Sequence, residues 1–162
     1  MKTALQKIRL PAAAGALALL VVGGALHAAP ATPADSAAAD SRTALACATP
    51  SNCVNSLGSS DLKPLHFAGT PAQAVAALRA TLAKFHEAKI LKTDTLSMEV
   101  VFTTAVGFQD LVDFRIDADA QRIDYRSRSK MGKYDFGKNH SRMSAFSTRF
   151  EQTTKRAPVT SP

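Results

Sequence analysis

A basic, glycine-containing segment between residues 126 and 142 is the part of the sequence best suited to chemistry. Gly132 and Gly137 permit tight turns, and the segment is predicted to lead into a helix whose first N–H groups lack partners. Lys and Arg side chains beside such N–H groups can hold a phosphate or a carboxylate. The candidate anion-binding residues are Arg126, Arg128, Lys130, Lys133, Asn139 and Arg142. The sequence therefore suggests an anion-binding function.

The same segment also has a purely structural interpretation. Asp135 and Asn139 could satisfy backbone donors in the long turn, because polar residues at turns and caps commonly serve the backbone. Asp113 could hold Arg126, and the other cations would then be solvated. In this interpretation the scaffold residues are Asp113, Asp135, Gly132 and Gly137.

Catalysis is a second alternative. Ser127 and Lys130 have the Ser-x-x-Lys spacing of acyl enzymes, but Ser127 is predicted on the apolar side of a strand rather than on a helix turn. Asp135 and Tyr134 could supply base and acid to a hydrolase or transferase, although no second carboxylate lies close in sequence. We therefore expect a non-catalytic domain, with Asp–Tyr chemistry or a purely structural or interaction role as alternatives.

No cofactor or metal ion is expected. The sequence has no glycine loop of the P-loop or dinucleotide-binding type, and His66, His86 and His140 have no ligand spacing. Cys47 and Cys53 are six positions apart, and in an oxidising compartment a disulfide between them is favoured over a metal site.

The N-terminus predicts export. Basic residues precede 17 uncharged residues over 10–26, and small residues follow at 28, 29 and 31, so residues 1–29 are interpreted as a signal peptide. An uncleaved membrane anchor is the alternative. Residues 30–46 have the Ala, Pro and Ser composition of a flexible linker, which leaves a single domain over 47–156 and a tail over 157–162.

The charge distribution bears on the partners. The chain carries 20 Lys and Arg against 13 Asp and Glu, and residues 122–156 hold 10 of the cations and only 3 of the acids. A periplasmic or secreted location argues against nucleic acid as the partner. Anionic lipids, acidic glycans or acidic proteins of the cell envelope are the expected partners.

Local patterns predict the elements that position the basic segment. Thr70, Pro71 and Gln73 predict a helix start with a capping box, and apolar residues then follow at helical spacing to position 85. Alternation predicts a strand over 96–103, with a partner strand around 90–91. Asn139 is predicted to cap a final helix.

Two further strands are predicted to form a hairpin around residues 118–121. Pairing positions that sum to 239 places Asp113 opposite Arg126, Arg115 opposite Asp124, and Asp117 opposite Arg122. A shift by two residues places like charges opposite each other, which favours this register by about 1–3 kcal/mol. The elements together predict a two-layer α+β domain with about four antiparallel strands and two helices on one sheet face.

The motifs in this region resemble a known family. The run RSRSKMGKYDFGKNHSR, from Arg126 to Arg142, is similar to the pattern R-S-x-S-R-x-G-x-x-D-x-G-x-N-R-x-R of the domain of unknown function 1499 family. Gln109-Asp110 stands for an acidic pair of that pattern, and Cys47 through Val54 resembles its early cysteine motif. Lys130 and His140 stand where the pattern has Arg. The resemblance covers nearly all of residues 47–151 and implies an exported protein, but no activity.

Overall fold

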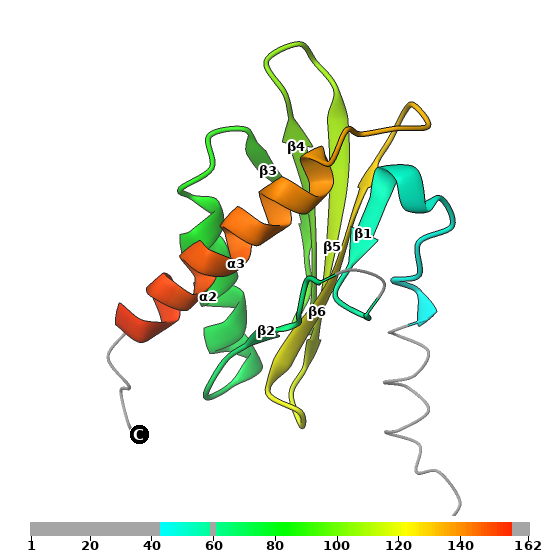
Figure 1. Ribbon diagram of the computed structural model, residues 1–162. Helices are drawn as coiled ribbons and strands as arrows, with labels where there is room; N and C mark the ends of the chain where they lie inside the picture. Colours follow the sequence, from blue (N-terminus) through cyan, green and yellow to red (C-terminus); the bar gives the residue numbers. More distant parts are fainter. Residues whose placement is uncertain (1–42, 59–60, 157–162) are drawn as a thin grey trace, which may run out of the picture. The chain divides into compact units, whose positions relative to one another are not determined.

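The computed structural model describes residues 43–58 and 61–156, which form an α+β domain (Figure 1). The elements in chain order are the 3-10 helix η1 (Pro50–Asn52), strands β1 (Cys53–Asn55) and β2 (Leu65–His66), helix α2 (Pro71–Leu82), strands β3 (Ala88–Thr93), β4 (Ser97–Thr103), β5 (Gln109–Asp117) and β6 (Arg122–Ser129), and helix α3 (Lys138–Arg156). The predicted signal peptide, most of the predicted linker and the tail lie outside the described residues. Neither described α-helix combines the length and the apolar character needed to cross a membrane.

The sheet is antiparallel and larger than predicted. It has six strands in the order β1-β6-β5-β4-β3, with β2 also paired to β6, whereas the sequence predicted about four. The two additional strands, β1 and β2, span three and two residues. Such short strands show no alternation of apolar and polar residues, so the pattern could not reveal them.

The predicted β5–β6 register is confirmed. Asp113 lies opposite Arg126, Arg115 opposite Asp124, and Asp117 opposite Arg122. Two of these pairs form ion pairs, at 2.7 Å for Arg126–Asp113 and 3.1 Å for Arg122–Asp117. Arg122 also contacts Asp124, at 3.2 Å. Opposite charges on one face of the hairpin therefore fix the pairing, as the sequence argument required.

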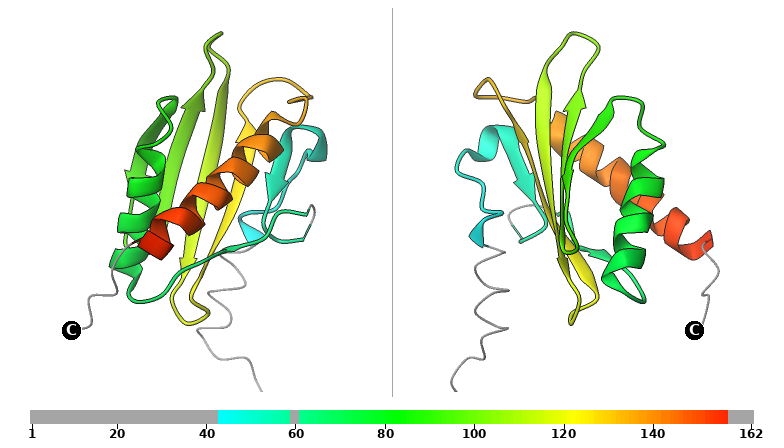
Figure 2. Two further views of the ribbon diagram at one scale, coloured as in Figure 1. Left: turned by 60° about the vertical axis from the view of Figure 1, so that its left-hand side comes forward. Right: turned by 180° about the vertical axis from the view of Figure 1, so that it is seen from behind.

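Both helices lie on one face of the sheet (Figure 2). The predicted capping box of α2 is present: Thr70 N donates to Gln73 Oε1 at 2.7 Å, and Gln73 N donates to Thr70 Oγ1 at 3.3 Å. Leu78 and Leu82 of α2 and Phe146 and Phe150 of α3 are buried. One core cluster joins them to the inward-facing residues of the sheet, which are Met98, Val100, Phe102, Val112, Phe114, Ile116, Ile123 and Tyr125.

The domain starts earlier than Cys47. The predicted Cys47–Cys53 disulfide is present. Leu45, assigned to the flexible linker, has no exposed surface, and its carbonyl accepts a hydrogen bond from Asn55 Nδ2 at 3.1 Å. The apolar side chain of Leu45 therefore anchors residues that composition alone assigns to a tether.

Candidate functional site

Helix α3 is capped by Asp135 rather than by Asn139. The Asp135 carboxylate accepts hydrogen bonds from Gly137 N at 3.0 Å and from Asn139 N at 2.8 Å, and the Asp135 carbonyl accepts one from Lys138 N. Gly137 has a φ of 73°, which an L-residue rarely adopts. The prediction that Asn139 is the N-cap was therefore wrong. Three N–H groups at the start of α3, those of Gly137, Lys138 and Asn139, are already bound by Asp135, which has the scaffold role given as the alternative.

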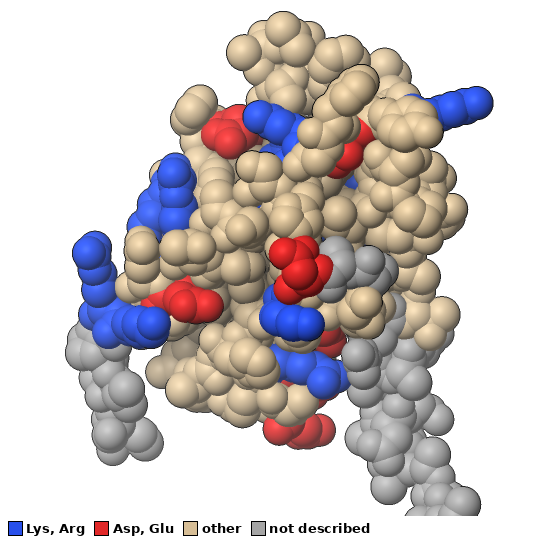
Figure 3. Space-filling model, in the orientation of Figure 1, with Lys and Arg blue, Asp and Glu red and all other residues tan. Residues whose placement is uncertain are grey.

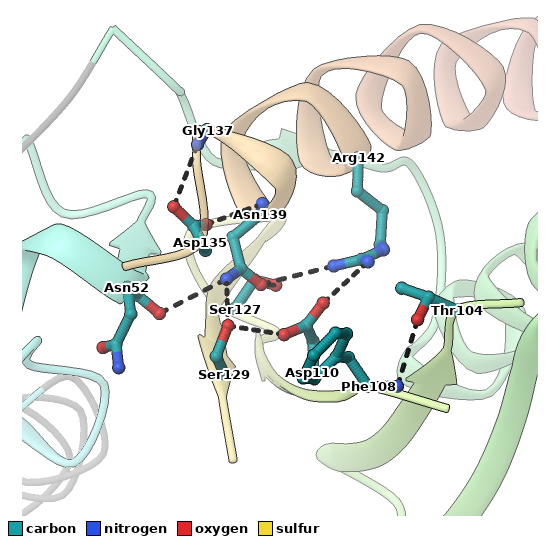
Figure 4. Close-up of polar contacts among 10 residues, drawn as sticks. All are labelled: Asn52, Thr104, Phe108, Asp110, Ser127, Ser129, Asp135, Gly137, Asn139 and Arg142. Atoms are coloured by element: carbon teal, nitrogen blue, oxygen red, sulfur yellow. Dashed lines mark hydrogen bonds and ion pairs between the residues drawn. The ribbon is translucent and has the colours of Figure 1, made fainter. Parts of the chain in front are cut away.

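Asn139 lies inside the domain and joins three elements (Figure 4). Its side chain is fully buried. Its Nδ2 donates to the Asn52 carbonyl of η1 at 3.3 Å and to Ser129 Oγ of β6 at 3.1 Å. Its Oδ1 accepts from Ser127 Oγ at 2.5 Å and from Arg142 Nη1 at 3.3 Å. With both ends of its amide occupied, Asn139 holds η1, β6 and α3 together.

Arg142 is also buried and already paired. Its Nη2 lies 2.7 Å from Asp110 Oδ2, and the two side chains are 4% and 6% exposed. The guanidinium carbon lies 4.9 Å from the centre of the Phe102 ring. Asp110 Oδ1 accepts a further hydrogen bond from Ser129 Oγ at 2.6 Å. The positive charge of Arg142 is therefore neutralised inside the domain, which contradicts its proposed exposure to an external anion.

The other candidate cations do not form one group. Arg126 and Arg128 alternate along β6 with Ser127 and Ser129, so they lie on the sheet face away from α3. Arg126 is held by Asp113, as the structural interpretation predicted, and it also donates to the Ala46 carbonyl. Arg128 is partly exposed and lies opposite Cys53 and Leu111. The predicted set is thus divided between the two faces of the sheet.

Lys130 and Lys133 are exposed on the loop of residues 130–137, which joins β6 to α3. Lys130 Nζ donates to Gln109 Oε1 at 2.9 Å. The backbone of this loop rests on η1: Ser51 Oγ donates to the Lys133 carbonyl, and Asn52 Nδ2 donates to the Gly132 carbonyl at 2.5 Å. The loop therefore presents both lysines at the surface of the domain, on a backbone that is hydrogen-bonded to η1.

A cavity of about 670 Å³ lies between this loop and the loop of residues 104–108, which joins β4 to β5. Its base includes Asp110 and Ser129 of the buried network. Its rim has five large apolar side chains with high exposed fractions: Val106 78%, Phe108 60%, Met131 74%, Tyr134 70% and Phe136 98%. Exposed apolar groups gathered at one place commonly mark an interaction site.

The sequence argument missed this feature. Met131, Tyr134 and Phe136 were visible as large apolar residues in a Gly- and Lys-rich turn, where no core could bury them. Their grouping with Val106 and Phe108 depends on the sheet, which brings two loops about 25 positions apart to the same end.

The lining of this cavity includes two lysines and two aspartates, and they differ in how far they are already engaged. Lys130 and Lys138 line it, and Lys133 lies on the same loop. Its two acidic lining residues are engaged internally, Asp110 by Arg142 and Asp135 by backbone N–H groups. The arrangement therefore combines apolar surface with positive charge, which suits a ligand that has an apolar part and an anionic group.

The candidate catalytic residues are not arranged as a nucleophile and a base. Ser127 is buried against Asn139, whereas Lys130 is exposed on the loop. Both carboxylate oxygens of Asp135 accept backbone hydrogen bonds, and Tyr134 is 70% exposed. Within the part of the chain that the structure describes, no group of three or more His, Cys, Asp or Glu residues could hold a metal ion.

Comparison with known proteins identifies the family. The model of the family described as "Protein of unknown function (DUF1499)" matches residues 44–150. The chain belongs to this family. No curated protein and no solved structure gives a significant match to this DUF1499 domain.

The fold shows what the motif does in this DUF1499 domain. Six residues of the stretches that resemble the family pattern take part in the cap and the buried network: Asp110, Ser127, Ser129, Asp135, Asn139 and Arg142. Within the run from Arg126 to Arg142, the two positions that depart from the pattern, Lys130 and His140, lie at least partly at the surface. The motif residues therefore connect β5, β6 and α3, and two of the network residues, Asp110 and Ser129, also line the cavity.

Proposed function

We propose that this domain is a non-catalytic binding module of the cell envelope and that its ligand is an anionic amphiphile. The apolar part of the ligand would occupy the cavity between residues 104–108 and 130–137, and the anionic group would contact the lysines at its edge. The observation that carries this proposal is the ring of five exposed apolar side chains beside Lys130, Lys133 and Lys138.

The dimensions and surface of the cavity support this function. Its volume of about 670 Å³ lies within the range of small-molecule sites, roughly 300–1,000 Å³. Phe108 and Met131 line it and remain largely exposed, so a bound apolar group would remove their surface from water. Such burial contributes roughly 25 cal/mol for each Å² of apolar surface.

The anion-binding role expected from the sequence is kept in this proposal, but with different residues. Arg126 and Arg142 are neutralised by Asp113 and Asp110, so they no longer belong to it. Lys130 and Lys133 remain, and Lys138 joins them. If residues 1–29 direct export as expected, lipid phosphates and acidic glycans would be the anions that the domain meets.

Calorimetric titration with dodecyl phosphate, below its micelle concentration, tests this function. Binding should be clear for dodecyl phosphate and much weaker for dodecyl maltoside, which has the same chain and no charge. Phe108→Ser should weaken binding about tenfold, because it removes apolar surface that the ligand would bury. Lys130→Gln should weaken it severalfold and reduce its salt dependence.

Matched variants serve as controls. Leu91→Ser removes another half-exposed apolar side chain, and Lys92→Gln removes another exposed lysine, both on β3. Neither should change the affinity. Equal affinity for the charged and uncharged amphiphiles, or equal loss in the control variants, would overturn the proposal.

A further inference from the structure

The rim of the cavity extends beyond what a ligand inside it could cover. Phe136 is 98% exposed, Val106 78% and Met131 74%. A small ligand contacts only the surfaces of these side chains that face the cavity. The remaining apolar surface would stay in water, so it indicates a second, larger apolar partner.

Both loops lie at the same end of the sheet (Figures 1 and 2). Lys130 N donates to the Gln109 carbonyl at 2.9 Å, which ties the start of one loop to the end of the other. Within the loop of residues 104–108, Phe108 N donates to Thr104 Oγ1 at 3.0 Å, and Thr104 N donates to the Phe108 carbonyl at 2.9 Å. The apolar side chains are thus presented on ordered backbone, which lowers the entropic cost of binding.

The lysines near the loops 104–108 and 130–137 indicate which kind of large apolar partner fits this end of the domain. Lys130, Lys133 and Lys138 lie on or beside the loops, whereas the neighbouring acids Asp110 and Asp135 are satisfied internally. Figure 3 shows the upper end of the molecule as mainly uncharged, with Lys or Arg and also Asp or Glu side chains just below it. A surface of aromatic and aliphatic side chains with adjacent lysines complements an apolar layer covered by anionic headgroups.

We propose that the loops 104–108 and 130–137 dock on the surface of an anionic lipid bilayer. Val106, Met131 and Phe136 enter the boundary between headgroups and acyl chains, and the three lysines contact lipid phosphates. The inference deepens the proposed function, on which it rests, because it makes a bilayer lipid the amphiphile that enters the cavity.

Co-sedimentation of the full chain with lipid vesicles tests the inference. One vesicle preparation contains phosphatidylcholine alone, and the other contains phosphatidylcholine mixed with phosphatidylglycerol. Binding should be stronger to the anionic vesicles and should fall as salt is raised. Every variant keeps residues 1–42, so any vesicle binding due to that segment is common to all.

Two groups of variants separate the lysines from the apolar side chains. Replacing Lys130, Lys133 and Lys138 together by Gln should lower partitioning to anionic vesicles about a hundredfold, which is about fivefold for each lysine. The control replaces Lys63, Lys92 and Lys155 by Gln and should retain most of the binding. Phe136→Ser combined with Met131→Ser should lower binding at least tenfold, whereas Leu91→Ser combined with Leu96→Ser should not.

The outcomes distinguish the two proposals. In one outcome the domain binds dodecyl phosphate, but it binds vesicles no better than the loop variants do. This result overturns the bilayer inference and leaves the proposed ligand-binding cavity unaffected. Vesicle binding that depends on the loop lysines, without dodecyl phosphate binding, supports docking and overturns the cavity ligand. An equal loss in the lysine control would show a nonspecific effect of net charge, which overturns the assignment to these loops.

Discussion

The guanidinium of Arg142 in α3 and the carboxylate of Asp110 in β5 form an ion pair of 2.7 Å between side chains that are 4% and 6% exposed. Because the pair lies beneath the cavity, it links the fold of the domain to its proposed binding surface. Asp110 also accepts a hydrogen bond from Ser129, so the carboxylate is held from two elements.

Arg142→Met is expected to destabilise the domain by about 3–5 kcal/mol, because it leaves the Asp110 carboxylate buried without its cation. Chemical denaturation followed by circular dichroism would measure the change. The double variant Arg142→Met with Asp110→Asn should recover part of the loss, since no buried charge then remains unpaired. A double variant no more stable than Arg142→Met alone would contradict the argument.

Asp135→Ala is expected to lower stability by about 1–2 kcal/mol, because Gly137 N and Asn139 N lose their acceptor at the start of α3. Thermal unfolding would measure this change. Asp119→Ala removes an exposed carboxylate in the β5–β6 turn and should have little effect. If the two variants were equally stable, the cap would not contribute to the stability of the fold.

Tyr125→Phe should leave stability unchanged or raise it by up to about 1 kcal/mol. The Tyr125 hydroxyl is buried and has no hydrogen-bond partner among the described residues. Burial raises the pKa of Tyr125, because it disfavours the charged phenolate. Denaturant unfolding would measure the effect, with the exposed Tyr134→Phe as control. A loss above 1 kcal/mol would show that the hydroxyl is satisfied.

Replacing Cys47 and Cys53 together by Ser should lower the free energy of unfolding by about 2 kcal/mol, because the disulfide closes a short loop. Adding a reductant to the unchanged protein should give the same loss, since the sequence contains only these two cysteines. Denaturation of both samples, with and without reductant, would compare the two. A reductant effect that persists in the double Ser variant would refute this explanation.

The pKa of Asp61 is lowered by the hydrogen bond and the charge of His140, whose Nε2 lies 2.6 Å from Asp61 Oδ1. The ionised Asp61 carboxylate therefore stabilises the folded state above the ordinary titration range of this carboxyl. This stabilisation is lost as the pH falls through the lowered pKa. An NMR titration of the Asp61 carboxyl carbon should show the low value, and His140→Gln should raise it. An unchanged titration curve in His140→Gln would exclude His140 as the cause.

The sequence predicted the parts of the fold that depend on local or paired patterns. The capping box at Thr70 and the β5–β6 register are of this kind, because each follows from residue types at fixed spacing. The pairing of Asp110 with Arg142 could not be predicted, since the two lie 32 positions apart and meet only when α3 packs on the sheet. The short strands β1 and β2 gave no pattern at all.

The candidate site was predicted less well, although one signal was available. The alternation used for the hairpin already places Arg126 on the face away from Tyr125 and Ser127, and hence away from the helices. If each candidate cation on β6 had been assigned to a sheet face by that alternation, Arg126 and Arg128 would have been separated from the residues on the helix side. Exposed loop residues such as Phe136 could be identified as candidate binding residues only because they are large and apolar in a turn that cannot bury them in the core.

The Cys47–Cys53 disulfide constrains residues that contact the loop beside the cavity. Ser51 and Asn52, which hold the backbone of Lys133 and Gly132, lie inside the ring closed by the Cys47–Cys53 bond. Reduction of that bond is expected to free the ring, whereas the central strands β4, β5 and β6 are paired without it. We therefore expect thiol reagents to change the width of the opening but not the sheet beneath it.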